Sequence, residues 1–254
     1  MAKLPLSVAI ISYNEEVNIR RTLESIAPFA AEIILVDSHS TDRTREIASE
    51  FGAEVFEEDW KGFMEQKNSA LSKCTQEWIL CLDCDEVLTE DLQSSLSSSL
   101  TQTKFVGFRI NRRTVYLGKI LHHAWQPDKK LRLVRRDAKP IWNNTVHESL
   151  SITGNISDIK GELLHYSYRD IRHHFEKTVY YAYHTSLSYH DRGKKPSIGK
   201  LILNPIYSFI RNYIFQHGFL DGIHGFIAAM SAFVYVFLKY AFLWEMRRNG
   251  KKDK

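Results

Sequence analysis

Three acidic residues crowd the end of an apolar run in the segment EWILCLDCDEVLTED, residues 77–91. The run WILCL leads directly into Asp83, Asp85 and Glu86. If the extended chain continues through Asp85, the side chains of Asp83 and Asp85 point to one face, because side chains alternate along a strand. Two carboxylates about 4 Å apart repel each other by about 4 kcal/mol at an effective dielectric constant of about 20. A divalent cation reverses this cost, and oxygen ligands select a hard ion such as Mg²⁺ or Mn²⁺.

The cysteines of the same segment allow a second interpretation, a redox or zinc pair. Cys81 and Cys84 have CxxC spacing, but on a strand they point to opposite faces, and two ligands do not complete a zinc site. We therefore expect both to be buried packing residues. With Cys74 they make three cysteines close together, an odd number that argues against a disulfide framework and for a reducing compartment.

Alternating strands and helices must position these residues along the first 100 positions. Asn14 is the predicted N-cap of the first helix, and Ser40 or Thr41 that of the second. The predicted strands are LSVAIIS (6–12), EIILVDS (32–38), AEVFE (53–57) and WILCLD (78–83), with a third helix at 62–73 and a fourth marked by Leu88, Leu92, Leu96 and Leu100. Units of roughly 25 to 30 residues that alternate strand and helix specify an α/β fold, a parallel sheet with helices on both faces.

Polar clusters follow three of these strands. They occupy residues 12–14, 37–40 and 83–86. In open α/β sheets, ligands bind beyond the carboxyl ends of the strands. We therefore expect the three clusters to converge on one site at that edge of the sheet.

Four segments in order, IISYNEE, VDSHSTDRT, KGFMEQKN and LDCDE, resemble the family-2 glycosyltransferases of the GT-A fold. They stand at the ends of successive β-α units and cover roughly residues 6 to 100. The resemblance implies a Rossmann-like, mostly parallel sheet, a UDP-sugar donor and a Mn²⁺ or Mg²⁺ cofactor. It also implies inversion of configuration by direct displacement, for which one general base suffices.

The resemblance further implies a set of nucleotide-sugar contacts. Asp37 would bind the uracil ring and Asp83 would lie near the ribose or the sugar. Asp85 would hold the metal that bridges the diphosphate. The implied nucleotide-sugar residues are Ser12, Tyr13, Asn14, Glu15, Asp37, Lys67, Asn68 and Asp83.

The catalytic base is expected in the segment WNNTVHESL, where the family commonly shows a Glu-Asp pair. Glu148 is the candidate, because it lies some 60 residues after the acidic motif. His147 is a candidate further metal ligand or acceptor contact, and a solvated strand end is the alternative for both residues. Trp125 and Trp142 could stack on a sugar, although partly buried core positions explain them equally well.

The second part of the chain differs in charge from the first. Residues 1–100 carry 8 Lys/Arg against 19 Asp/Glu, whereas residues 101–254 carry 26 against 11. The runs FVGFRI, TVYLG and KLRLVRR predict short strands that extend the sheet in antiparallel fashion. The basic stretch KKLRLVRR, residues 129–136, suits phosphates or carboxylates of an acceptor, or is a solvated strand face.

The order VHE, GFLDG and an apolar helix is similar to that of the lipopolysaccharide core-biosynthesis glycosyltransferases of this family. Their acceptor is an anionic, phosphorylated, lipid-linked saccharide, and the resemblance implies no nucleic-acid partner. The donor sugar would be a hexose such as glucose. Transfer to a polyprenyl phosphate or to another envelope polysaccharide is the alternative.

We expect two parts, a GT-A catalytic domain at residues 1–170 and amphipathic helices at 171–254. A helical stripe is predicted behind Pro205, formed by Ile206, Phe209, Ile210, Tyr213 and Ile214. The uncharged stretch 226–238 is about 20 Å long as a helix, against about 30 Å of hydrocarbon in a bilayer. We therefore expect it to lie on the inner face of the cytoplasmic membrane, or else to pack against the domain or a partner chain.

Two other functions also fit parts of the pattern. LDCDEV matches the D-x-D-x-[TV] motif of haloacid dehalogenase-type phosphatases. That motif normally follows the first strand, whereas three β-α units precede it here. The second alternative is a nucleotide-sugar-binding module without catalysis. Such a module would show no sugar transfer or donor hydrolysis with any donor.

Overall fold

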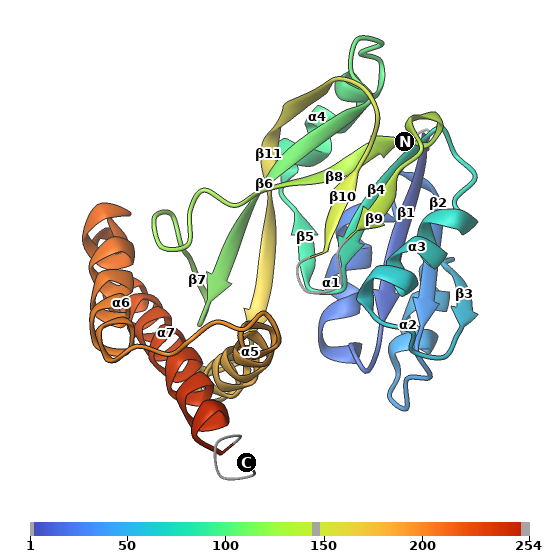
Figure 1. Ribbon diagram of the computed structural model, residues 1–254. Coiled ribbons are helices and arrows are strands. Elements are labelled where there is room, and N and C mark those ends of the chain that lie inside the picture. The colour runs from blue at the N-terminus through green and yellow to red at the C-terminus, as the bar shows by residue number, and fades with distance from the viewer. Residues whose placement is uncertain (1–2, 144–147, 250–254) are drawn as a thin grey trace. The chain divides into compact units, whose positions relative to one another are not determined.

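The computed structural model of the protein describes residues 3–143 and 148–249 (Figure 1). The chain forms two compact units. The first unit contains residues 1–112 and 128–166, and the second contains residues 113–127 and 167–254. The loop 113–127 therefore groups with the C-terminal helices.

The first unit is built on four parallel strands, as the β-α alternation predicts. They are β1 (Leu4–Ser12), β2 (Ala30–Asp37), β3 (Glu54–Glu57) and β4 (Trp78–Asp83), in the order β3-β2-β1-β4. The helices are α1 (Glu16–Ile26), α2 (Thr44–Glu50), α3 (Phe63–Lys73) and α4 (Glu90–Leu100). Figure 1 shows the strands in blue to cyan beside these helices.

An antiparallel extension continues the sheet beyond β4, also as predicted. Its order is β8 (Lys129–Arg135), β6 (Gly107–Tyr116), β11 (Ile156–Tyr168) and β5 (Glu86–Leu88). The short strands β9 (Ile141–Asn143) and β10 (Ser149–Ser151) form a separate antiparallel pair, and a 3-10 turn η1 spans Arg136–Ala138.

The runs FVGFRI and TVYLG lie mostly in one strand, β6, instead of two. The polar residues between them remain in the strand because Asn111 pairs with Lys129 of β8, and Arg112 forms an ion pair with Asp128. These partners are distant in sequence, which is why the local pattern suggested a break.

Apolar side chains fill both faces of the sheet. One cluster joins β1, β2 and β4 to α1, α2 and α4, and a second joins the opposite face to α3, β9 and β10. Cys74, Cys81 and Cys84 are buried and free, which confirms the expectation that Cys81 and Cys84 are packing residues. Burial raises the pKa of the Cys81 thiol to about 12.

The second unit is mainly helical, as predicted from Ile171 onward. It contains β7 (Lys119–Ile120), α5 (Ile171–Asp191), α6 (Ile198–Ile210), a π-helical turn η2 (Arg211–Phe215), a 3-10 turn η3 (Gly218–Asp221) and α7 (Ile223–Asn249). The predicted helical stripe from Ile206 to Ile214 lies in the last part of α6 and in η2. α6 begins at Ile198 and contains Pro205, which is buried.

The motif GFLDG anchors a loop within this unit. The carboxylate of Asp221 accepts hydrogen bonds from the backbone N–H groups of His122, His123 and Ala124 at 3.0, 2.9 and 2.8 Å. These bonds outweigh the effect of burial and lower the pKa of Asp221. Next to this loop, Trp125 packs edge-on against Tyr116. Trp125 thus belongs to an aromatic cluster of the fold.

α7 is longer than the uncharged stretch that predicted it. The part Ile223–Arg248 has 26 residues, and an 18-residue window within it has a mean hydropathy of 1.9, so by length and composition alone this helix is able to cross a membrane. The complete helix is therefore long enough to span a bilayer, whereas the uncharged stretch 226–238 was expected to be too short. Within the second unit α7 packs against both α5 and α6, its neighbour in Figure 1. The hydroxyl of Tyr235 lies 2.9 Å from that of Thr185, and Asn204 donates to Tyr240 at 3.0 Å.

Candidate active site

The carboxyl ends of the parallel strands bring the predicted polar clusters to one edge. In the sheet register, Ser12 at the end of β1 pairs with Asp37 at the end of β2. On the other side of β1, Ile11 pairs with Asp83 at the end of β4. The three clusters therefore lie at one edge of the sheet, as predicted.

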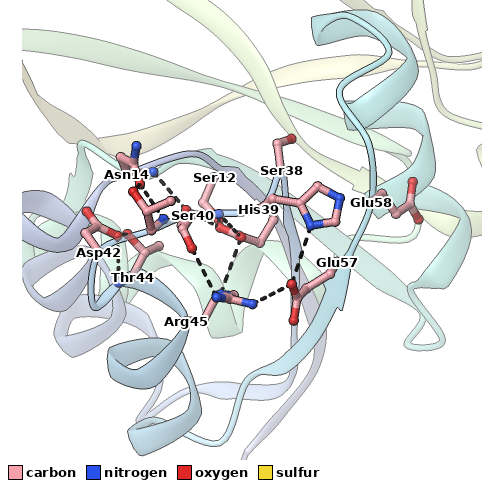
Figure 2. A network of polar contacts seen from close by, with 12 residues as sticks. Ser12, Asn14, Ser38, His39, Ser40, Asp42, Thr44, Arg45, Glu57 and Glu58 are labelled. Atoms are coloured by element: carbon pink, nitrogen blue, oxygen red, sulfur yellow. Dashed lines mark hydrogen bonds and ion pairs between the residues drawn. The ribbon is translucent and has the colours of Figure 1, made fainter.

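Asp37 is fully buried and fixes the loop after β2. Figure 2 shows the polar network around this loop, with Ser12, Ser40 and Arg45 labelled. Ser12 Oγ donates to its Oδ2 atom at 2.6 Å, and Ser40 Oγ donates to the same atom at 2.6 Å. The Ser40 backbone N–H donates to Oδ1 at 2.7 Å. The Nε atom of Arg45 lies 3.8 Å from Oδ1, and Arg45 also pairs with Glu57. The carboxylate of Asp37 thus holds two serines and an arginine in place.

The turn after β1 is cross-linked to the loop after β2. Asn14 has a left-handed backbone (φ 54°), a conformation that asparagine tolerates. Its N–H donates to Ser40 Oγ at 2.8 Å, and its Oδ1 accepts from the Thr41 N–H at 2.8 Å. The Glu15 N–H donates to Thr44 Oγ1 at 2.7 Å, while the Tyr13 ring stays exposed.

These contacts correct the predicted helix caps. α1 begins at Glu16 and α2 at Thr44, so neither Asn14 nor Ser40 caps a helix. Both residues join one loop to the other instead, and Asp42 accepts from the Thr44 N–H at 3.0 Å at the start of α2. Local patterns do not distinguish a cap from a bond between loops, because both require the same short polar side chains.

Asp83 lies between two cations. Its Oδ1 atom is 3.0 Å from Lys67 Nζ, and its Oδ2 atom accepts from Arg132 Nη2 at 2.7 Å. Burial by itself would raise the pKa of Asp83, but the charges of Arg132 and Lys67 outweigh it and hold that pKa well below its usual range. Lys67 Nζ also stands 4.6 Å from the ring centroid of Trp142. Asp83 is therefore ionised and oriented at the edge of the sheet.

Glu86 is fully buried and shares these cations. Its Oε1 atom accepts from Arg132 at 2.7 Å and from Arg112 at 3.2 Å, and its Oε2 atom accepts from the Asp83 N–H at 3.0 Å. The repulsion between the crowded acids is thus offset by the protein's own arginine and lysine side chains. A metal is not required to explain why Asp83 and Glu86 stand together.

The arginines were missed as site residues. The sequence assigned the stretch 129–136 to an acceptor or to a solvated face, whereas Arg132 is 4% exposed and faces Asp83 and Glu86. An arginine inside the apolar run LRLV was the available signal, because a buried charge needs a partner.

Asp85 lies in a turn, so the extension of the strand to this residue is wrong. β4 ends at Asp83, and Cys84 and Asp85 form a turn before β5. The Oδ2 atom of Asp85 is 3.3 Å from Nε2 of His165, a β11 residue. Both side chains are partly exposed, 20% and 17%. The expected metal ligand His147 lies outside the described residues.

A carboxylate beside an imidazole fits Mn²⁺, which accepts oxygen and nitrogen ligands. Within residues 3–143 and 148–249, no group of three or more His, Cys, Asp and Glu side chains is placed to hold a metal ion. Asp85 and His165 would therefore need further ligand atoms from a bound diphosphate.

Asn68 has a structural partner. Its Oδ1 atom accepts from the Trp142 N–H at 2.8 Å, and its Nδ2 atom donates to the Trp142 carbonyl at 3.0 Å. The side-chain amide thus fixes β9 on α3. Trp142 itself is 5% exposed, as expected for a core position. Glu148, the predicted base, is partly exposed and directly precedes β10.

Comparison with known proteins identifies the family. Residues 7–153 match the family described as Glycosyl transferase family 2. The lipopolysaccharide core biosynthesis glycosyltransferase LpsC of Rhizobium meliloti is 32% identical, over 96% of this chain and 93% of that protein. The chain belongs to glycosyltransferase family 2. An uncharacterized glycosyltransferase of Rickettsia typhi is 29% identical, over 98% of this chain and 89% of that protein.

A solved structure supports the fold of this family-2 glycosyltransferase. Glucosyl-3-phosphoglycerate synthase from Mycobacterium tuberculosis, in complex with phosphoglyceric acid, superposes with a TM-score of 0.50 at 18% identity. The match covers 76% of this chain and 81% of that chain. The predicted GT-A-type α/β fold is confirmed, and the phosphatase alternative for the motif LDCDEV is wrong.

Proposed function

We propose that this family-2 glycosyltransferase transfers a sugar from a UDP-sugar to an anionic, lipid-linked saccharide. The observation that carries the proposal is the edge where Asp83, held by Lys67 and Arg132, stands beside the partly exposed Asp85 and His165. A rigid, charged edge at the carboxyl ends of parallel strands is where such folds bind nucleotides.

We assign nucleotide binding to the loops after β1 and β2, which are joined by hydrogen bonds. The exposed ring of Tyr13 is available to stack on the uracil base, and the turn of Ser12, Asn14 and Glu15 would shape its pocket. Asp37 keeps that turn in position through its hydrogen bond from Ser12. Its buried carboxylate already accepts three hydrogen bonds, so we assign it the positioning of Ser12 for contact with the base.

Asp85 and His165 would hold a Mn²⁺ or Mg²⁺ ion together with the diphosphate. Such an ion neutralises charge on the leaving diphosphate. Lys67 and Arg132 would add positive charge near the same group while they keep Asp83 ionised and oriented toward the ribose or sugar. This assigns the metal to His165 in place of His147.

Glu148 remains the proposed general base. It directly precedes β10, whose partner β9 is tied to α3 by Asn68. A partly exposed carboxylate at this position is able to take a proton from an incoming hydroxyl, which a buried ion-paired residue such as Glu86 is not.

The acceptor assignment rests on the relative LpsC and on charge. A lipopolysaccharide core saccharide bears phosphates, and the 26 Lys/Arg against 11 Asp/Glu of residues 101–254 suit such a partner. A polyprenyl-phosphate or other envelope acceptor is the alternative. Either acceptor requires the enzyme to work at the inner face of the cytoplasmic membrane, and a hexose such as glucose is the proposed sugar.

Isothermal titration calorimetry with UDP tests the donor site. Wild-type protein should bind UDP in MnCl₂ and lose at least tenfold affinity in EDTA. Asp85→Asn and His165→Gln should bind in MnCl₂ about as weakly as the wild type binds in EDTA. Asp91→Asn, an exposed acid at the start of α4, is the matched control and should bind like the wild type. Equal affinity of all four proteins with and without metal would refute the metal assignment.

A donor screen tests the reaction. UDP release would be followed with glucose, galactose, N-acetylglucosamine and heptose nucleotides. Glu148→Gln should keep UDP affinity and lose transfer, whereas near wild-type turnover would refute the base assignment. Absence of release with every donor, despite UDP binding, would identify a binding module without catalysis.

A further inference from the structure

Helix α6 exposes one entirely apolar face to solvent. Six residues at helical spacing form it, and their side chains are between 39% and 75% exposed. They are Ile198, Ile202, Leu203, Ile206, Tyr207 and Ile210, which we call the α6 face. The opposite side packs on α7, where Asn204 donates to Tyr240 and Pro205 is buried.

The chain after α6 also exposes apolar side chains. Exposed apolar side chains recur up to the first residue of α7, at Ile214, Phe215, Phe219, Leu220 and Ile223. Single exposed apolar residues are common, but a contiguous series of this size marks an interaction site. The six residues of the α6 face are exposed, so the other helices of this unit do not cover them.

The same segment is strongly basic. Residues 192–220 contain five Lys/Arg and no Asp/Glu. Lys194 and Lys195 precede α6 and Lys200 lies in its first turns, and these three lysines line a pocket of about 310 Å³. Its remaining walls are Tyr189, Tyr240 and Leu243. None of the three lysines forms an ion pair with a carboxylate of the described residues.

We propose that the α6 face docks onto the surface of an anionic phospholipid bilayer, with a lipid headgroup phosphate in the lysine pocket. An apolar helix face flanked by basic residues is the composition of helices that lie in the membrane interface. A second copy of the chain fits less well, because two lysine pockets would repel each other. The proposal rests on the proposed function, and it assigns the membrane contact to α6 instead of to the C-terminal helix.

Deletion of residues 226–254 is a poor test, because it removes the helix on which α5 and α6 pack. A charge-matched pair of variants is sharper. The triple variant Lys194→Gln, Lys195→Gln, Lys200→Gln removes three charges from the pocket. Its control removes the same three charges from the C-terminal end by Lys251→Gln, Lys252→Gln and Lys254→Gln.

Binding would be measured by co-sedimentation with vesicles of phosphatidylcholine and 30% phosphatidylglycerol in 0.1 M NaCl. Each lysine at an anionic surface contributes about a fivefold gain in partitioning, so the pocket triple should bind about a hundredfold more weakly than the wild type. The terminal triple should lose less than tenfold. Equal losses would mean undirected attraction between charges and would overturn the pocket. Inorganic phosphate at 10 mM should not displace the wild type, and full displacement would identify a free-phosphate site.

A probe on the helix tests the apolar contact. The native cysteines are buried, so Leu203→Cys would carry a polarity-sensitive fluorophore on the α6 face. Its emission should shift to the blue and at least double with anionic vesicles. The same label at Val179→Cys, an exposed position of α5, should change less than half as much. Equal changes at both positions, or none at Leu203→Cys, would overturn the proposal.

Two further outcomes name the competing occupants. Sedimentation analysis should show a monomer whose mass is unchanged in Leu203→Gln, and a dimer that this variant dissociates would make the α6 face a self-association surface. Wild-type protein should leave the vesicles in alkaline carbonate, and retention would place α7 across the bilayer. UDP binding is measured without lipid, so a negative vesicle-binding result does not contradict the proposed function. A negative UDP-binding result likewise does not contradict docking of the α6 face.

Discussion

Replacing Arg132 by Met removes the cation shared by Asp83 and Glu86. Methionine has a similar length and no charge, so packing against Trp142 is largely kept while two charge-assisted hydrogen bonds at 2.7 Å are lost. The variant leaves Glu86, which is fully buried, with Arg112 at 3.2 Å as its remaining arginine partner. Asp83 keeps Lys67 at 3.0 Å.

The size of the effect follows from this partial compensation. Removing one partner of a buried ion pair lowers the free energy of unfolding by about 3 to 5 kcal/mol. Because Arg112 and Lys67 remain as partners of the two acids, we expect a loss near the lower end of this range, about 3 kcal/mol. For a unit of about 150 residues, this lowers Tm by about 6 to 12 °C. Arg109→Met is the control, because Arg109 forms its ion pair with Asp158 in solvent and should cost less than about 1 kcal/mol.

The pH dependence of the loss gives a second test. Because the pKa of Asp83 is held below its usual range, its ionised form stabilises the fold above about pH 4, and this contribution is lost as the pH falls through the folded-state pKa. The variant has a smaller contribution to lose. The difference in Tm between wild type and Arg132→Met should therefore be largest at pH 7 and smaller at about pH 2.5, inside the window below the unfolded-state pKa.

Differential scanning calorimetry at both pH values measures these differences. Adding Glu86→Gln to Arg132→Met should recover part of the loss, because the buried glutamate no longer carries an uncompensated charge. A Tm within 2 °C of the wild type at pH 7, or a loss equal to that of Arg109→Met, would refute the reasoning that Arg132 neutralises the acidic cluster.

Three further predictions concern the rest of the chain. His174 is buried beside the Tyr116 hydroxyl at 2.8 Å, and burial lowers its pKa to about 4, helped by the charges of His173 and Lys177. The unfolded state therefore binds more protons between pH 6.5 and 4, so the wild type should lose up to about 3 kcal/mol over this window. His174→Phe should flatten that dependence in urea unfolding, and parallel profiles would contradict it. Asn68→Ala should cost about 1 to 3 kcal/mol through its two lost backbone hydrogen bonds and weaken donor affinity, as followed by thermal unfolding and calorimetry with UDP. Asp221→Asn should cost about 2 kcal/mol in urea unfolding, because an amide offers one acceptor oxygen to the three N–H groups that the carboxylate satisfies, and unchanged stability would contradict the anchoring role.

Helix ends and strand breaks show where local patterns failed. Asn14 and Ser40 have the composition of N-caps, yet they bond between loops, because β1 and β2 lie next to each other in the sheet. β6 continues through a polar stretch because Arg112 forms ion pairs with Glu86 and Asp128. In each case a partner distant in sequence supplied the interaction.

The sequence by itself determined the β-α order, the parallel sheet, the antiparallel extension and the edge at which Ser12, Asp37 and Asp83 meet. Strand and helix periodicity are local properties, and parallel strands bring their carboxyl ends to one side wherever they occur. The order of four motifs along the chain was also sufficient for the family, which residues 7–153 confirm.

The tertiary structure alone decided what balances the acids in EWILCLDCDEVLTED. Arg132 reaches Asp83 and Glu86 across 49 and 46 residues of chain, and His165 reaches Asp85 from another strand. It also decided that α6 exposes an apolar face, since the packing of α7 determines which side of that helix is buried. Ion pairing and burial depend on distances between side chains, and these distances are set by the fold.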